Sequence, residues 1–189
     1  MNHPTDFPLL PQGPLSKMAL ERGLTSFAQL TDYIRRLPYG RTSQKTQLDQ
    51  VFSEQKGTCS SKHALLKAIA VEQQQALPSL VIGMYRMSQA NTPGVGSVLQ
   101  AHGLSYIPEA HCYLKYGEER VDVTSESANF DLIADALIWE EDIQAEQIGA
   151  YKLQLHQKFL RQWQTTDAPS HSFEELWAIR EACIEALSQ

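Results

Sequence analysis

The two segments on either side of Gly117-Glu118 constrain the fold more than any other part of the chain. Residues 111–116 and 120–124 are rich in aromatic and β-branched side chains, and a short reversal joins them. This pattern predicts a β-hairpin with a two-residue loop. The pairs that face each other in this register are Tyr116 with Glu119, Tyr113 with Asp122, and His111 with Thr124.

The same register sorts the side chains by chemistry. One face is apolar and carries Cys112, Leu114, Tyr116, Val121 and Val123. The other face is mainly polar and carries His111, Tyr113, Arg120, Asp122 and Thr124. On the polar face His111 and Asp122 are diagonal neighbours, at roughly 5–8 Å between backbones. We therefore expect a hydrogen bond between their side chains, with Cys112 turned away into the core. Tyr113 beside them either shapes a substrate cleft or only covers the sheet.

Helical periodicity accounts for much of the remaining chain. Helices are expected from Thr25 or Ser26 to about Leu37, from Ser60 onward, over residues 131–164, and after a capping box at Ser172 and Glu175. Residues 80–85 predict a strand, and residues 88–108 a long loop with one helical turn. This order is that of an α+β fold. The expected organisation is an irregular lead (1–24), an α+β core (25–130) and a helical extension packed on the core (131–189).

Charge and length exclude several classes of function. The 189 residues include 16 basic and 22 acidic side chains, a formal net charge of −6. We expect no nucleic-acid partner, because binding phosphates needs a concentrated positive face. The sequence has no apolar run near the roughly 18 residues that cross a bilayer and no export signal. The expectation is a cytoplasmic protein without membrane contact, in which the three cysteines are reduced thiols.

Cys59 is the cysteine whose position favours chemistry. It stands in Gly57-Thr58-Cys59-Ser60-Ser61, where a flexible turn enters a long helix. The partial positive charge of a helix start stabilises a thiolate, which is the form of cysteine that attacks a carbonyl carbon. Taken alone, a cysteine at a helix end is more often a small packing residue. Cys183, on the amphipathic last helix, is expected to have that packing role.

Three short motifs together resemble the transglutaminase-like superfamily, a group within the papain-type cysteine folds. They are Gly57-Thr58-Cys59-Ser60 opening a helix, His111 beginning a strand, and Val121-Asp122-Val123-Thr124 on the next strand, and the resemblance spans residues 45–127. It implies a core helix that bears the cysteine, packed on an antiparallel sheet, with flanking N- and C-terminal helices. The chain is similar to a small, stand-alone, bacterial-type member, because it is too short for the accessory domains of cross-linking enzymes. Those enzymes also have a tryptophan before the cysteine, whereas Trp139, Trp163 and Trp177 all lie after it.

The resemblance implies a catalytic triad of Cys59, His111 and Asp122. His111 would take the Cys59 proton, Asp122 would orient the imidazole, and an amide or ester would form a thioester that passes to water or an amine. One oxyanion donor is expected to be the backbone N–H of Cys59. For the second donor, Gln50 is preferred over the neighbouring glutamines.

Alternatives follow from the same residues. The expected substrate is a peptide, a protein amide or a small amide or ester, and no metal or cofactor is expected, because His102, His111 and Cys112 lack zinc-like spacing. His63, one turn after Cys59, is interpreted as an ordinary, partly exposed helix histidine. The alternative function is a non-catalytic domain of the same fold that binds a peptide or protein. The complete triad favours the enzyme.

Overall fold

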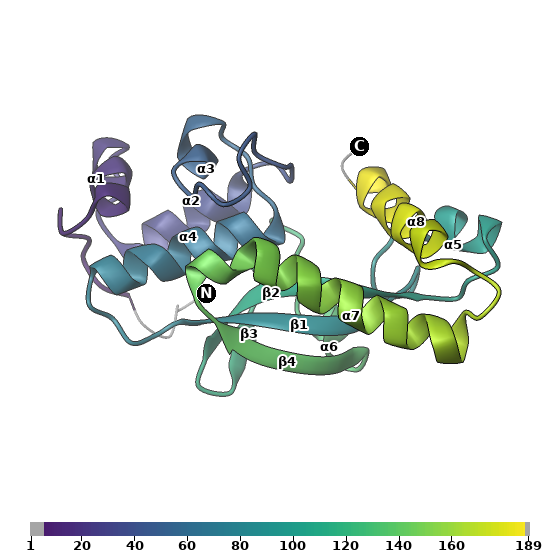
Figure 1. Cartoon of the computed structure of the whole chain (residues 1–189). Helices are drawn as coiled ribbons and strands as arrows, with labels where there is room; N and C mark the ends of the chain where they lie inside the picture. The colour runs from purple at the N-terminus through teal and green to yellow at the C-terminus, as the bar shows by residue number, and fades with distance from the viewer. Residues whose placement is uncertain (1–5, 188–189) are drawn as a thin grey trace. The chain divides into compact units, whose positions relative to one another are not determined.

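The computed structural model describes residues 6–187, which combine helices with one sheet. The elements in chain order are α1 (Pro14–Glu21), α2 (Phe27–Arg36), α3 (Gln50–Ser53), α4 (Cys59–Glu72), β1 (Ser79–Met87), α5 (Gly96–Ala101), β2 (Ile107–Tyr116), β3 (Glu119–Val121), α6 (Asp131–Ala134), β4 (Leu137–Ile143), the 3-10 helix η1 (Ala145–Ile148), α7 (Ala150–Asp167) and α8 (Phe173–Ala186). Over this described range four strands form an antiparallel sheet in the order β3-β2-β1-β4, packed against helices (Figure 1). The α+β prediction is confirmed. None of the helices within residues 6–187 has the length and apolar character needed to cross a membrane.

Contacts divide the chain into two compact units. The first contains the described residues up to Ile82 together with residues 112–130 and 141–149, and the second contains residues 83–111, 131–140 and the described residues from 150 onward. The division therefore falls inside strands β1, β2 and β4 rather than at a linker.

Helix α4 is the centre of the first unit. Helices α1, α2 and α3 pack against it (Figure 1), and so does the 3-10 helix η1. Its side chains are buried around most of its circumference, including Ala64, Leu65, Leu66 and Ile69. A helix surrounded in this way has no need of a polar stripe, which explains its weak amphipathic pattern.

The β2–β3 hairpin has the predicted two-residue loop. Leu114 pairs with Val121, Lys115 with Arg120 and Tyr116 with Glu119, and Gly117 provides the left-handed turn at φ +62°. The prediction that the second strand continues to Thr124 is wrong, because β3 ends at Val121. The pairs Tyr113–Asp122 and His111–Thr124 therefore lie beyond the ladder.

A side-chain turn explains why β3 is short. The Oδ1 atom of Asp122 accepts hydrogen bonds from the backbone N–H of Thr124 at 2.9 Å and from its hydroxyl at 2.6 Å. Aspartate that bonds the backbone two residues ahead offers an alternative to strand pairing. The expected polar face also differs: Tyr113 is fully buried and packs on Phe130, with ring centroids 4.6 Å apart. Because Tyr113 is buried, it is better explained as a residue that covers the sheet than as one that shapes a substrate cleft.

The prediction of continuous helix over residues 131–164 is wrong. This segment contains the short helix α6, the strand β4, the 3-10 helix η1 and only then the long helix α7. Its strand begins with Leu137-Ile138-Trp139, residue types that favour β structure. Three carboxylates follow, at residues 140–142, and their place on the last strand in the sheet order suits an edge, where charge discourages further pairing.

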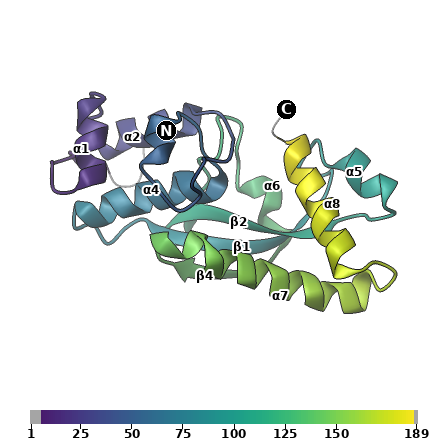
Figure 2. The ribbon, with the colours of Figure 1, turned by 45° about the horizontal axis from the view of Figure 1, so that its top comes forward.

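The second unit contains the C-terminal helices. Helix α8 begins at the predicted capping box, in which Ser172 and Glu175 bond each other's backbone N–H groups. It packs against α5 and α7 (Figure 2). The buried carboxylate of Glu109 on β2 forms two hydrogen bonds of 2.7 Å with the guanidinium of Arg180, which fastens α8 to the strand. Helix α5 is the helical turn expected inside the long 88–108 loop.

Candidate functional site

Cys59 is the first residue of α4. The preceding residue, Thr58, caps the helix: its hydroxyl accepts from the N–H of Ser61, and the Ser61 hydroxyl accepts from the N–H of Thr58. The thiol lies 3.8 Å from the hydroxyl of Ser60, and Cys59 is 8% exposed. The sequence prediction of a cysteine at a helix start is confirmed, so the thiol stands at the positive end of the helix.

The three cysteines differ in burial. Cys112 and Cys183 have no exposed surface, and burial raises the pKa of the Cys183 thiol to about 11, with a smaller contribution from Glu109. Both therefore fit the packing roles expected for them. Cys59 alone keeps residual exposure, so it is the thiol that a substrate or reagent can reach most directly.

Lys62, one turn into α4, is fully buried. Its Nζ donates to two backbone carbonyls, that of Leu37 at 2.5 Å and that of Thr124 at 2.6 Å. Burial lowers the pKa of Lys62 to about 8, although Asp122 and Cys59 act in the opposite direction. The side chain thus connects the end of α2, the start of α4 and the loop after β3 with one ammonium group.

Gly57 makes room for this lysine. A Cβ atom at Gly57 would lie 2.8 Å from Cγ of Lys62, closer than two carbon atoms can approach. The residue also bonds the segment after α2: its N–H donates to the carbonyl of Pro38 and its carbonyl accepts from Gly40. The glycine before the cysteine is therefore explained by the space that Lys62 needs, not by an unusual backbone angle.

His63 is fully buried, so its interpretation as an ordinary, partly exposed histidine is wrong. Its Nδ1 lies 2.6 Å from the carbonyl oxygen of Cys59, and its Nε2 accepts from the backbone N–H of Val123 at 2.8 Å. Nδ1 must carry the proton because a carbonyl cannot donate, and Nε2 must offer its lone pair, so the imidazole is neutral. The 3.5 Å approach of Nε2 to Asp122 is accordingly a close contact, not an ion pair.

Asp122 is held in place by the two residues that follow it. Its carboxylate accepts from Thr124 in the turn described above, and its side chain is 8% exposed. The next two residues of the loop are fixed to α4, Val123 by His63 and Thr124 by Lys62. Two consecutive residues of α4, Lys62 and His63, thus hold the two residues that follow Asp122. Asp122 and Cys59 accordingly belong to the same unit.

His111 lies on β2 and is partly exposed. It is the last residue of its segment in the second unit, whereas Cys112 belongs to the first. Its imidazole meets the ring of Tyr85 edge-on, with centroids 6.2 Å apart. The grouping of His111 with Cys59 and Asp122 as a triad stays a prediction.

Gln50 lies in α3, where a loop orients its amide. Its Oε1 accepts from the hydroxyl of Ser43 at 2.9 Å and from the N–H of Gln44 at 2.7 Å, and its Nε2 donates to Gln47 at 3.4 Å. The role of Gln50 as the second oxyanion donor also stays a prediction.

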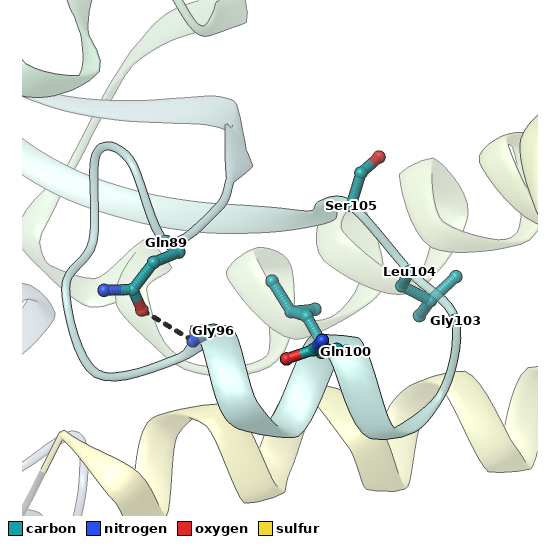
Figure 3. Close-up of a pocket in the computed structure, with 7 residues that line it drawn as sticks. Gln89, Gly96, Gln100, Gly103, Leu104 and Ser105 are labelled. Carbon is teal, nitrogen blue, oxygen red and sulfur yellow. Dashed lines mark hydrogen bonds between the residues drawn. The ribbon is translucent and has the colours of Figure 1, made fainter.

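A hollow of about 360 Å³ in the second unit lies beside α5. Its lining consists of Gln89, Gly96, Leu99, Gln100, Gly103, Leu104 and Ser105 (Figure 3). Gln89 occupies the start of α5, since its Oε1 accepts from Gly96 at 2.8 Å. None of these lining residues is a carboxylate, imidazole or thiol, so the hollow offers no acid–base pair for catalysis. Among the residues that the structure describes, no three His, Cys, Asp or Glu side chains gather as a metal site would require.

Comparisons with protein-family models, curated proteins and solved structures find no match to this chain. The candidate site is therefore argued from its own residues. Sequence reasoning missed Lys62 and gave His63 the wrong environment. Their place directly before the apolar run of a helix that is buried on nearly every side is the one local feature that sets them apart, and it does not identify their partners.

Proposed function

We propose that this protein is a cysteine-dependent enzyme that transfers acyl groups from an amide or ester, in the manner of transglutaminase-like hydrolases. The observation that carries the proposal is the position of Cys59 as the first residue of the buried helix α4, in one unit with the anchored carboxylate of Asp122. A helix start favours the thiolate. A carboxylate held by a turn suits the orientation of a catalytic imidazole.

The proposed reaction has two steps. His111 accepts the proton of Cys59, and the thiolate attacks the carbonyl carbon to form a tetrahedral oxyanion. The carbon–nitrogen or carbon–oxygen bond then breaks, the leaving amine or alcohol takes the proton from His111, and a thioester remains. Water, activated by His111, adds to the thioester and releases the acid and the thiol; an amine in place of water gives transfer instead of hydrolysis.

Within this proposal each residue has a defined task. Asp122 keeps the imidazole of His111 in the useful tautomer. The backbone N–H of Cys59 is one donor to the oxyanion, and Gln50 is the candidate for the other. The substrate is a peptide, a protein amide or a small amide or ester. The proposed location is the cytoplasm, where the three cysteines would stay reduced.

Thiol reactivity tests the proposal without a known substrate. Iodoacetamide at neutral pH, with the modified peptides identified by mass spectrometry, should label Cys59 much faster than Cys112 or Cys183. The His111→Ala variant should label Cys59 much more slowly than the wild type, whereas His102→Ala, at an exposed histidine, should keep the wild-type rate. Slow and equal labelling of all three thiols would reject the enzyme and favour a domain that only binds a peptide or protein.

A further inference from the structure

A buried lysine in the first turn of a helix is unfavourable in two ways. Burial removes the hydration of the ammonium group. The positive end of the helix also repels a cation, which is more stable near the last turn. An apolar residue such as methionine would fill the same space at lower cost. Retaining Lys62 at this position therefore needs a compensating interaction.

Hydrogen bonds supply part of the compensation. The carbonyl oxygens of Leu37 and Thr124 accept from Nζ at 2.5 and 2.6 Å. These acceptors are neutral, so they solvate the ammonium without balancing its charge. Two groups that can carry negative charge favour the ammonium of Lys62. They are the carboxylate of Asp122, in the loop after β3 that Lys62 itself holds at Thr124, and the thiol of Cys59 when it ionises; Cys59 lies three positions before Lys62 on α4, the spacing of side chains that are neighbours on a helix surface. From the end of α2, the carbonyl of Leu37 accepts from Nζ, and the charged residues of its last turn, Arg35 and Arg36, are cations that cannot balance the ammonium.

These attractions are mutual. An anion that favours the charged form of Lys62 is favoured to the same extent by the ammonium. Lys62 is therefore coupled to the nucleophile and to the orienting carboxylate of the proposed site. Its stem crosses Gly57, the glycine of the motif that precedes Cys59.

We propose that Lys62 is a positioning residue that supplies the fixed positive charge of the Cys59 site, stabilising the thiolate while it fastens the Asp122 loop to α4 and to the end of α2. This inference rests on the proposed function, because a charge beside Cys59 matters only where the thiolate reacts. Lys62 would contribute to the site in two ways, through its positive charge and through its hydrogen bonds to the two carbonyls, and different substitutions remove them.

The working range of this charge follows from its environment. Burial, partly offset by Asp122 and Cys59, lowers the pKa of Lys62 to about 8. The ammonium is thus present at neutral pH and is lost as the pH rises through about 8. The stabilisation of the thiolate should be greatest below that value.

Two variants of Lys62 test the proposal through the pH profile of iodoacetamide labelling at Cys59. Lys62→Gln removes the charge but keeps amide donors near the two carbonyls, and Lys62→Met keeps the packing without either. Both should raise the titration midpoint of the labelling rate by about one pH unit, the size expected for loss of a nearby opposite charge. The matched control is Lys67→Gln on the same helix, whose Nζ bonds the carbonyl of Ala76 instead; its profile should equal that of the wild type.

A measurement on the wild-type chain covers the case in which neither variant folds. The midpoint of Lys62, followed by ¹⁵N NMR of its side chain, should fall after Cys59 is alkylated, because the anion that favours its charge is then absent. An unchanged midpoint would overturn the inference, as would unchanged labelling profiles in folded variants of Lys62. If wild-type Cys59 reacts no faster than the other thiols, the proposed function itself fails. If Cys59 reacts fast but its labelling profile does not change when Lys62 is replaced, only the inference about Lys62 fails.

Discussion

Replacing His63 with leucine should destabilise the protein through one backbone group. In the wild type the N–H of Val123 donates to Nε2 of His63 at 2.8 Å, and both groups are buried. Leucine is of similar size, so the substitution removes the acceptor without leaving a large cavity. A buried donor that loses its acceptor costs about 1–3 kcal/mol. The lost bond from Nδ1 to Cys59 adds little, because that carbonyl also accepts the ordinary helix bond.

The expected change is measurable by thermal unfolding. Chains of 150–250 residues change their melting temperature by about 2–4 °C per kcal/mol, so the melting temperature should fall by about 2–12 °C. The His63→Gln variant should lose less, because its Oε1 can take the place of Nε2 and accept from Val123. His102→Leu, at an exposed position, is the control and should melt like the wild type.

A local readout separates this bond from general loss of packing. Amide hydrogen exchange at Val123 should accelerate more in His63→Leu than in His63→Gln, because only glutamine can restore an acceptor. If His63→Leu melts within about 1 °C of the wild type and Val123 keeps its protection, the neutral, doubly bonded imidazole is not what holds the loop after β3.

Three further results are expected. Arg180→Met leaves the carboxylate of Glu109 buried without its guanidinium partner and should lower the free energy of unfolding in urea by about 3–5 kcal/mol. Burial alone would raise the pKa of Glu109, but Arg180 holds it at about 2. The pair therefore makes its whole contribution to stability above pH 4.5 and loses it as the pH falls toward 2. An unchanged denaturation midpoint, or acid stability equal to that of the wild type, would contradict this. Gly57→Ala should displace the Lys62 stem and lower both the melting temperature and Cys59 labelling, and normal values for both would show that the space is not needed. Ser172→Ala removes the cap of α8 and should cost about 1 kcal/mol, which equal unfolding curves would refute.

Local signals made much of the fold predictable. The caps at Ser26 and Ser172 bond their own helices as expected, and the reversal at Gly117-Glu118 fixes the hairpin register. Each of these features depends on residues close in sequence, so composition and spacing are enough to identify it. The α+β class follows from their order.

The errors arose where distant contacts decide the structure. The strand β3 ends early because Asp122 bonds Thr124 and because the next N–H, that of Val123, donates to His63 sixty residues away. Residues 140–142 fall within the helix predicted over residues 131–164, yet they lie on the last strand in the sheet order. No periodicity of a single segment reports which edge of a sheet it will join.

The candidate site divides in the same way. Cys59 at a helix start could be predicted, because the turn before it and the apolar run after it are both local. The burial of Lys62 could not, since a lysine is exposed by default and its two carbonyl partners come from separate parts of the chain. Gly57 gained its explanation only once the path of that lysine was known.

The ionisation of the Cys59 thiol tests the central claim most directly. In a Cys112→Ala, Cys183→Ala background, the absorbance of the thiolate near 240 nm reports a single group, which can be titrated with and without His111→Ala. The account predicts a thiolate already present at neutral pH in the parent. In the His111 variant the midpoint should rise but stay below the ordinary thiol value of about 8.5, because Lys62 and the helix start remain. Titration near 8.5 in both proteins would contradict it, because Cys59 would then be a packing residue at a helix end.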